Sequence, residues 1–418
     1  MGDFIMAFVK PFLCIRPKEQ YASRVAALPY DVYNRKEAKQ EIMREPLSFL
    51  KVDRPETNFG EEVDTHDSIV YTKAKELLIT MQEEGILLAE ESPCYYVYEL
   101  IMKGRSQTGL VACASIDDYL NNVIKKHENT REEKELDRIH HVDICDMHTG
   151  PIFLAYRSHK VISDAVSDTK KEAPIYQFVS SDGISHNVWK IDQPDRSKAI
   201  FEAFEQIDSI YIADGHHRAA SAVKVGLKRR SENPGYTGEE EFNYFLSVLF
   251  PHDQLMIMPY NRTVKDLGGL SQEEFLTKLK EIFIVDYRSE TPYSPEQKAT
   301  FGMYLKDGWY SLALKEQRRE IKDPVEALDV SLLQDYVLGP ILGIEDPRVD
   351  NRIDFIGGIR GLRELERRVG EDMAVAFSMY PTSIEELFAV SDAGKLMPPK
   401  STWFEPKLRS GLFLHKLS

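Results

Sequence analysis

One short stretch of the sequence brings together residue types that bind charged groups. An apolar run from Ser209 to Ala213 is followed at once by five residues of a different kind, Asp214-Gly215-His216-His217-Arg218. A strand that passes through Asp-Gly into a helix leaves the first helical N–H groups unpaired, and such a helix end attracts anions. Because three potential cations stand beside one carboxylate, the turn predicts a site for phosphate or another anion.

A simpler interpretation of the same stretch needs no ligand. Asp214 could act only as the N-cap of the helix, with the two histidines as surface residues of its first turn. A metal pair is disfavoured, because adjacent helical residues point about 100° apart and His216 and His217 cannot chelate one ion as an i, i+4 pair does. The anion site and the cap alone both stay open at this point.

The elements around the turn predict how it is positioned. Residues 209–213 are β-branched or aromatic, as in a buried strand, and the small apolar residues after His216 indicate a helix. Residues 93–118 read as a β-hairpin, 67–86 as an amphipathic helix, and 48–52 as a short strand-like piece. Strands and helices are mixed along the whole chain, which predicts a mixed α/β (α+β) protein.

Two further polar regions are candidates for a site, and each has a plain alternative. The charge run from Lys125 to Arg138 is either a solvated helix or the wall of a polar site, since its pairs Glu133–Asp137 and Lys134–Arg138 are like-charged. Asp31 precedes a helical segment and is either its cap, the simpler choice, or a site carboxylate.

The end of the chain offers a third polar group. After Pro398-Pro399 come one cation and two hydroxyls, Lys400-Ser401-Thr402, which suit a phosphate held at a rigid turn. The alternative is an ordinary loop before a last strand.

Composition and charge exclude several classes of protein. The 418 residues are 42% hydrophobic and 29% charged, which is typical of a globular protein, and the net charge of −15 argues against non-specific nucleic-acid binding. A local basic cluster can still bind phosphate. The four cysteines lack CxxC spacing and no signal peptide is evident, so we expect reduced thiols in a cytoplasmic protein. No apolar run reaches the ~18 residues of a membrane span, and a homo-oligomer is compatible with the sequence.

Common nucleotide and hydrolase motifs are missing from the sequence. It contains no GxxxxGK[ST], no GxGxxG after a strand, no HExxH and no GxSxG. P-loop, Rossmann, zincin and α/β-hydrolase interpretations therefore lose support. If the chain binds a nucleotide, it does so with a less common fold.

Four separated motifs resemble a known family. Besides the 211–218 stretch they are Pro29-Tyr30-Asp31-Val32, the run Lys126-His127-Glu128-x-Thr130-Arg131 with Glu135-x-Asp137-Arg138, and Met397-Pro398-Pro399-Lys400-Ser401-Thr402-x-Phe404-x-Pro406-Lys407. Their order over nearly the whole chain is similar to that in the domain-of-unknown-function family numbered 1015.

That family resembles the ParB/sulfiredoxin-like superfamily, in which a Gly-x-x-Arg turn at a helix start binds nucleotide phosphates. Gly215 and Arg218 match this turn. The superfamily includes CTP-using partition proteins, ATP-using sulfiredoxin and kinases of free serine, and the DGHHR turn looks most similar to the last. The essential cysteine of sulfiredoxin has no match, since Ala213 and Ala219 flank the turn. The resemblance implies a nucleotide-binding core over 1–265 and a C-terminal α/β region over 266–418, whose loop 397–411 returns to the site.

The activity that the resemblance implies is transfer of phosphate from ATP or ADP, with Mg²⁺, to free L-serine. Gly215, His216 and His217 would cradle phosphate, Arg218 would neutralise charge, and Asp214 would contact Mg²⁺ or orient other groups. The base would be Glu128 or Asp31, with Glu128 preferred because His127, Thr130 and Arg131 surround it. A nucleotide-sensing module without turnover and a phosphatase are the alternatives. Three sets complete the expected site: catalytic Glu128, Asp31 and His217; phosphate-binding Asp214, Gly215, His216, His217, Arg218, Lys400, Ser401 and Thr402; and supporting Tyr30, His127, Thr130, Arg131, Asp137 and Arg138.

Overall fold

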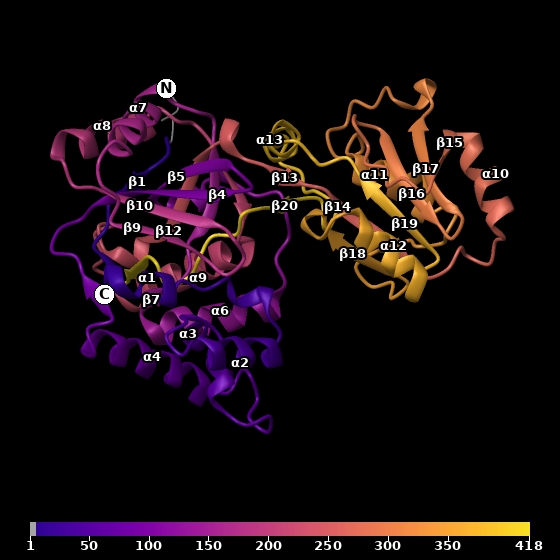
Figure 1. Cartoon of the computed structure of the whole chain (residues 1–418). Helices are drawn as coiled ribbons and strands as arrows, with labels where there is room; N and C mark the ends of the chain where they lie inside the picture. Colours follow the sequence, from indigo (N-terminus) through magenta and orange to yellow (C-terminus); the bar gives the residue numbers. More distant parts are fainter. Residues whose placement is uncertain (1–5) are drawn as a thin grey trace. The chain divides into compact units, whose positions relative to one another are not determined.

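The computed structural model describes residues 6–418, and the chain forms two compact units, Met1–Leu255 with Pro406–Ser418, and Met256–Glu405 (Figure 1). The sequence suggested a division between 265 and 266. The structure divides the chain after Leu255 and assigns the C-terminal tail to the first unit.

A large mixed sheet forms the centre of the first unit. Its strand order is β6-β11-β8-β12-β5-β4-β10-β9, with β1 paired to β5. Strand β11 pairs in parallel with β6 and β12 in parallel with β8, whereas the other pairs are antiparallel. The strands are β1 Val9–Lys10, β4 Tyr95–Met102, β5 Arg105–Ser115, β6 Ile124–Lys125, β8 Ile152–Tyr156, β9 Tyr176–Val179, β10 Ser185–Ile191, β11 Ile210–Asp214 and β12 Tyr244–Pro251.

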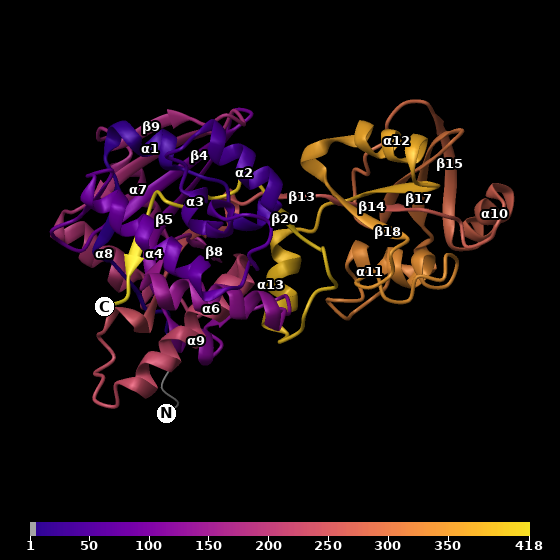
Figure 2. The ribbon, with the colours of Figure 1, turned by 90° about the horizontal axis from the view of Figure 1, so that it is seen from below.

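Helices cover both faces of this sheet. In Figure 1, α7 and α8 lie on one side, and α9, α6 and then α4 lie on the other. Helices α6 and α9 lie side by side in Figure 2 and contact each other along their length. The helices of this unit are α1 Glu19–Val25, α2 Arg35–Arg44, α3 Leu50–Asp53, α4 Ser68–Glu83, α5 Ile116–Leu120, α6 Glu132–Cys145, α7 Lys160–Thr169, α8 Pro194–Phe204 and α9 His216–Glu232.

A second, smaller sheet ties the C-terminal tail into the first unit. Its order is β3-β2-β21-β7, with β2 Cys14–Pro17, β3 Leu87–Ala89, β7 Met147–His148 and β21 Leu414–Lys416. Because β21 lies between β2 and β7, the last residues of the chain are held beside segments from its first half.

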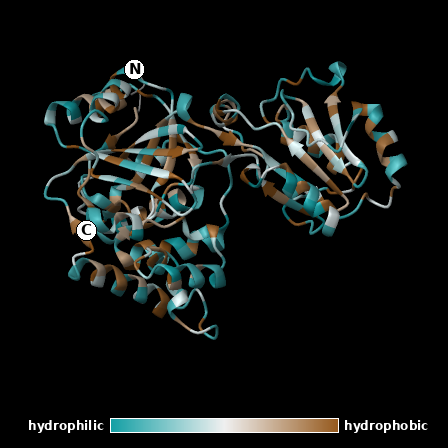
Figure 3. Ribbon diagram, viewed as in Figure 1, coloured by the Kyte–Doolittle hydropathy of each residue, from teal (hydrophilic) through white to brown (hydrophobic). Residues whose placement is uncertain are grey.

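The central strands are buried on both faces. Their sequences are therefore largely continuous apolar runs and do not alternate between apolar and polar residues. In Figure 3 these strands are largely brown, whereas the helices alternate between teal and brown. Strand β11 is part of this core, since Ile210 and Ile212 are fully buried with Ala219 and Ala222 of α9. This burial fixes where the strand ends, and so fixes the position of the turn at Asp214.

The second unit contains a separate antiparallel sheet of order β15-β17-β16-β19-β14-β18. Its strands are β14 Tyr260–Val264, β15 Phe283–Ser289, β16 Thr300–Leu305, β17 Gly308–Leu314, β18 Ile353–Gly357 and β19 Val375–Met379, with β13 Ile257–Met258 paired to β20 Trp403–Phe404. Its helices are α10 Gln272–Ile282, α11 Asp329–Leu333, α12 Leu362–Glu371 and α13 Ile384–Asp392. The predicted mixed α/β class is confirmed, as are the hairpin β4–β5 and the helix α4.

Three local predictions are wrong. Residues 48–52 are predicted to be strand-like, but they lead into the short helix α3. Five residues are too few to distinguish the two-residue period of a strand from the 3.6-residue period of a helix. Asp31 does not cap α2, since Asn34 does so in a capping box with Glu37. The charge run is helical only from Glu132 onward, so His127 to Arg131 form a loop.

Among the helices of residues 6–418, none combines the length and the apolar character that a membrane crossing requires.

Candidate anion-binding site

The turn between β11 and α9 has a backbone that requires glycine. Gly215 adopts φ 92° and ψ 33°, in the left-handed region. A Cβ at this position would lie 3.0 Å from Nε and Nη2 of Arg218, whose side chain folds back over the turn. Glycine therefore allows both the sharp entry into the helix and the close approach of the guanidinium to its first turn.

Asp214 is not the N-cap of α9. Gly215 occupies that position, and within residues 6–418 no side-chain cap bonds to the first N–H groups of the helix. The Asp214 carboxylate instead accepts from Lys407 Nζ at 2.8 Å. Burial raises the pKa of Asp214, but the charges of Lys407 and Arg218 outweigh it and hold this pKa well below its ordinary value. The helix end is therefore left without a side-chain cap, beside an ionised carboxylate.

The two histidines of the turn diverge, as their adjacent positions predicted. The imidazole of His217 accepts from the Arg131 backbone N–H through Nε2 at 3.0 Å, so its proton is on Nδ1. Burial, together with the charge of Lys134, lowers the pKa of His217, while the charges of Glu135 and Asp31 oppose this. His217 thus joins the loop before α6 to the turn, with Asp31 close enough to interact electrostatically.

His216 points the other way, into the protein. Its ring stands edge to face with that of His127, with centroids 4.5 Å apart, and its Nδ1 is 3.8 Å from Glu128 Oε2. The loop from His127 to Arg131 is held there by α6 and α9, because Thr130 and Lys224 both donate to the Glu135 carboxylate. His127, Glu128 and Arg131 of the predicted charge run therefore contact the two histidines of the turn.

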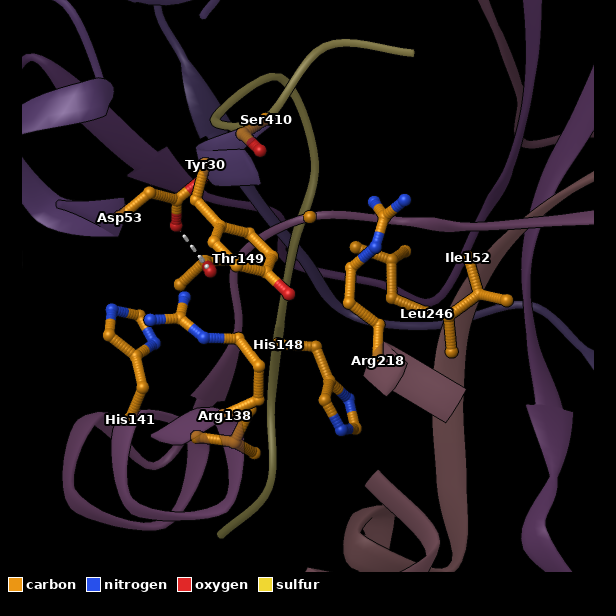
Figure 4. Close-up of a pocket in the computed structure, with 12 residues that line it drawn as sticks. Tyr30, Asp53, Arg138, His141, His148, Thr149, Ile152, Arg218, Leu246 and Ser410 are labelled. Atoms are coloured by element: carbon orange, nitrogen blue, oxygen red, sulfur yellow. Dashed lines mark hydrogen bonds between the residues drawn. The ribbon is translucent and has the colours of Figure 1, made fainter. Parts of the chain in front are cut away.

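A pocket opens beside Arg218 in the first unit. Figure 4 shows side chains from segments far apart in the sequence converging on it. The pocket is small and partly open to solvent. It is lined by Tyr30, Asp53, Arg138, His141, Val142, His148, Thr149, Gly150, Ile152, Arg218, Leu246 and Ser410.

Two guanidinium groups and one carboxylate give the pocket its polar character. Arg218 donates to the Pro151 carbonyl at 2.7 Å, and the buried Arg138 stacks on the Tyr30 ring, 4.1 Å from its centroid. Asp53 is 2% exposed and accepts from Thr149 Oγ1 at 2.8 Å. The pocket can therefore complement a ligand that carries both negative and positive charge.

Asp137 fixes Arg138 from behind. Its carboxylate accepts from Arg138 Nε at 2.8 Å and from the Tyr71 hydroxyl at 2.9 Å. Burial lowers the pKa of Arg138, but the negative charges of Asp137 and Asp53 outweigh this effect and raise the pKa above its ordinary value. The guanidinium therefore stays charged. The predicted pair Asp137 and Arg138 thus holds one cation in place at the pocket.

Lys400, Ser401 and Thr402 lie in the second unit, not in the unit that contains the turn. There, Arg262 donates to the Lys400 carbonyl at 3.0 Å and Thr382 donates to the Ser401 carbonyl at 2.9 Å. Their role in phosphate binding stays a prediction. Further along the same tail, Lys407 and Ser410 belong to the first unit and contact the turn and the pocket.

Sequence reasoning missed several residues of the pocket. Asp53 was overlooked because its segment was read as strand-like, and His141 because it lies on the buried face of α6. Thr149 and Ser410 lie in loops, one of which carries the sequence His148-Thr149-Gly150-Pro151 directly before β8. The polar residues beside glycine and proline in that loop were a usable signal.

Comparison with solved structures finds distant likenesses. SbnI with C-terminal truncation from Staphylococcus aureus is 12% identical, with 72% of this chain and 85% of that chain covered and a TM-score of 0.38. A mutant free serine kinase in complex with ADP is 15% identical, with 75% and 92% covered and a TM-score of 0.35. A conserved hypothetical protein from Pyrococcus furiosus is 13% identical, with 72% and 93% covered and a TM-score of 0.30.

Comparison with curated proteins finds no match. The family model described as "Protein of unknown function (DUF1015)" matches residues 9–331, which is more than half of the chain. The family predicted from the four motifs is thereby confirmed, and the chain belongs to the DUF1015 family.

Proposed function

We propose that the protein is a small-molecule kinase that transfers phosphate from ATP or ADP to the hydroxyl of free L-serine. The observation that carries this proposal is the position of Arg218. Its guanidinium lies over the uncapped start of α9 and also lines the adjacent pocket. A phosphate bound at the helix end would thus lie next to a second bound molecule, which is what phosphoryl transfer needs.

The pocket supports an amino acid as acceptor. A zwitterion presents a carboxylate, for which the buried Arg138 is a partner, and an ammonium group, for which Asp53 is a partner. Asp53 and Arg138 lie close enough together for the charge of Asp53 to raise the pKa of Arg138. A free amino acid matches this pair of charges better than a peptide residue, which has neither terminal charge.

The chemical step balances as a direct transfer. A carboxylate takes the proton of the serine hydroxyl, the oxygen attacks the terminal phosphorus, and the bond from that phosphorus to the bridging oxygen breaks. The products are O-phosphoserine and ADP or AMP. The N–H groups of the first turn of α9, with Arg218, would bind the negative charge on the transferring group.

Two carboxylates are candidates for the base. Asp31 follows Tyr30, which lines the pocket, and it acts electrostatically on His217. Glu128 lies against His216 instead. Mg²⁺, when bound with the nucleotide, would supply charge neutralisation through the phosphates and one carboxylate. Asp214 offers an ionised oxygen for this, although its pairing with Lys407 favours an orienting role.

The test is a product assay. The purified chain is incubated with L-serine, Mg²⁺ and either ATP or ADP, and mass spectrometry is used to detect O-phosphoserine and to show whether ADP or AMP accumulates. We expect O-phosphoserine from wild type and a large loss of it in Asp31→Asn or Glu128→Gln, whichever removes the base.

Three results would overturn parts of the proposal. Binding of nucleotide without any product would favour a sensing role. Labelling of another acceptor in place of serine would overturn the substrate. Release of phosphate from O-phosphoserine in the absence of nucleotide would favour a phosphatase.

A further inference from the structure

Two buried imidazoles and a carboxylate meet beside the Gly215 turn. His127 is 2% exposed and His216 is 5% exposed, and their rings are perpendicular with centroids 4.5 Å apart. Glu128 follows His127 in the loop and places Oε2 3.8 Å from His216 Nδ1. One ligand atom from each of the three side chains lies within 4.8 Å of the other two.

The buried ring nitrogens lack hydrogen-bond partners. Among residues 6–418, none bonds to either nitrogen of His127 or to Nε2 of His216. The backbone of Ile212 acts on the His127 ring but forms no hydrogen bond of normal geometry with it. An unpaired buried polar atom costs about 1–3 kcal/mol, and native proteins rarely leave one without water or an ion. A single ion can bind one nitrogen of each ring, so it would give a partner to one nitrogen of His127 and one of His216.

The electrostatics of the cluster suit a cation. Imidazole coordinates a metal ion through the lone pair of one ring nitrogen, and a carboxylate coordinates it in the ionised form. The Glu128 carboxylate lies 3.8 Å from His216 Nδ1, and the charge of Asp214 acts on both rings.

We propose that His127, Glu128 and His216 bind one divalent transition-metal ion. Two imidazole nitrogens and one carboxylate oxygen form the donor set that zinc and non-haem iron accept, whereas Mg²⁺ favours oxygen ligands alone. The remaining coordination positions are available to water or an anion at the turn. The three ligands come from the chain itself, so the inference does not depend on nucleotide binding.

The geometry requires a small closure on the ion. Metal bonds of about 2.0–2.2 Å place ligand atoms about 3–4 Å apart, somewhat closer than the 4.8 Å limit of the three atoms. His127 and Glu128 lie in the loop between β6 and α6, and this loop would have to approach His216 for all three side chains to reach one ion. If Glu128 is a metal ligand, Asp31 is left as the base of the proposed kinase.

The experiment measures metal binding without nucleotide. The full chain is stripped with a chelator and titrated calorimetrically with Zn²⁺, Mn²⁺ or Mg²⁺. We expect one site per chain, with affinity in the order Zn²⁺, Mn²⁺, Mg²⁺, as imidazole ligands predict. His127→Gln and His216→Gln should each weaken Zn²⁺ binding at least tenfold, and Glu128→Gln should weaken it by a smaller factor.

The matched control is His140→Gln, which removes an exposed histidine of α6 and should leave Zn²⁺ affinity unchanged. Wild-type affinity in both His127→Gln and His216→Gln would overturn the proposal, as would a site that binds Mg²⁺ as tightly as Zn²⁺. A second measurement needs no variant. Co²⁺ bound to wild type should show the visible absorption of a nitrogen-ligated, low-coordinate ion, and a spectrum identical to that of aqueous Co²⁺ would also contradict the site.

Discussion

Two buried polar clusters of the first unit, one at β4 and one at the β11–α9 turn, differ in how fully their atoms are bonded. At β4, Glu99 is 7% exposed, and it accepts from Ser106 at 2.5 Å, Lys170 at 2.6 Å and Asn187 at 2.8 Å. At the β11–α9 turn, the helix start has no side-chain cap and the nitrogens of His127 and His216 lack partners within residues 6–418. Both clusters bury charge, but the Glu99 cluster is complete without a ligand.

Under the proposed function, this difference distinguishes a structural cluster from a ligand-binding one. A fully bonded buried network contributes rigidity, and replacing one of its members lowers the stability of the fold. A cluster with unpaired donors and acceptors costs stability in the free protein and recovers it when a ligand binds. We therefore expect substitutions at Glu99 to change folding, and substitutions at the turn to change ligand binding.

The largest effect is expected from Arg218→Met. This change removes the guanidinium that lies over Gly215, and loss of one such donor to a transition-state charge lowers rates by roughly 100-fold or more. The measurement is kcat/KM for O-phosphoserine formation, with the exposed Arg24→Met as control. A rate within threefold of wild type for Arg218→Met would remove this residue from the site.

His127→Gln should change how stability depends on pH. The pKa of His127 is about 4 in the folded chain and about 6.5 when unfolded, so the unfolded state takes up a proton first as the pH falls. The stability that depends on neutral His127 is fully present above about pH 6.5. It is lost as the pH falls toward 4, which lowers the free energy of unfolding by about 3 kcal/mol. Urea unfolding with chelator present gives the free energy of unfolding at each pH between 4 and 7. This free energy should depend less steeply on pH in His127→Gln than in wild type or His140→Gln.

Glu99→Gln should lower the free energy of unfolding by about 2 kcal/mol, because three hydrogen bonds to a charged group are weakened. Its affinity for nucleotide should stay that of wild type. Urea unfolding at pH 7 measures the first quantity, and Glu202→Gln on the exposed face of α8 is the control. A stable Glu99→Gln protein with weakened nucleotide binding would reverse the assignment of the two clusters.

The smallest effect is expected from Lys407→Met. The pair Lys407–Asp214 is partly exposed, so its loss should cost less than about 1 kcal/mol at pH 7. Lys407 lowers the pKa of Asp214, and stability from a lowered carboxyl pKa is present above the unfolded value of about 4 and is lost below it. The difference in unfolding free energy between variant and wild type should therefore shrink below pH 4.

Much of the fold near the turn could be predicted from the sequence, because it follows from local patterns. The apolar run before Asp214 and the Asp-Gly pair placed the end of β11 and the start of α9, and the hairpin β4–β5 followed from two apolar runs and a turn. The prediction for residues 48–52 failed because three buried apolar residues, Phe49, Leu50 and Val52, fit a short strand and a helical turn equally well.

The site was harder to predict, because long-range pairing assembles it. His127 faces His216 although 89 positions separate them in the chain, counted as 216 minus 127. Ser410 reaches the pocket because its backbone pairs with Ala27 and β21 inserts between β2 and β7. No local pattern encodes such pairings, so the sequence identified the groups at the turn but not the pocket beside it.

The most direct test of the account is calorimetric titration of ADP with Mg²⁺ into three proteins, namely wild type, Arg218→Met and Glu99→Gln. We expect one ADP per chain for wild type, at least tenfold weaker binding for Arg218→Met, and wild-type affinity for Glu99→Gln. Absence of ADP binding to wild type, or equal affinity in wild type and Arg218→Met, would contradict the assignment of the β11–α9 turn as a nucleotide phosphate site.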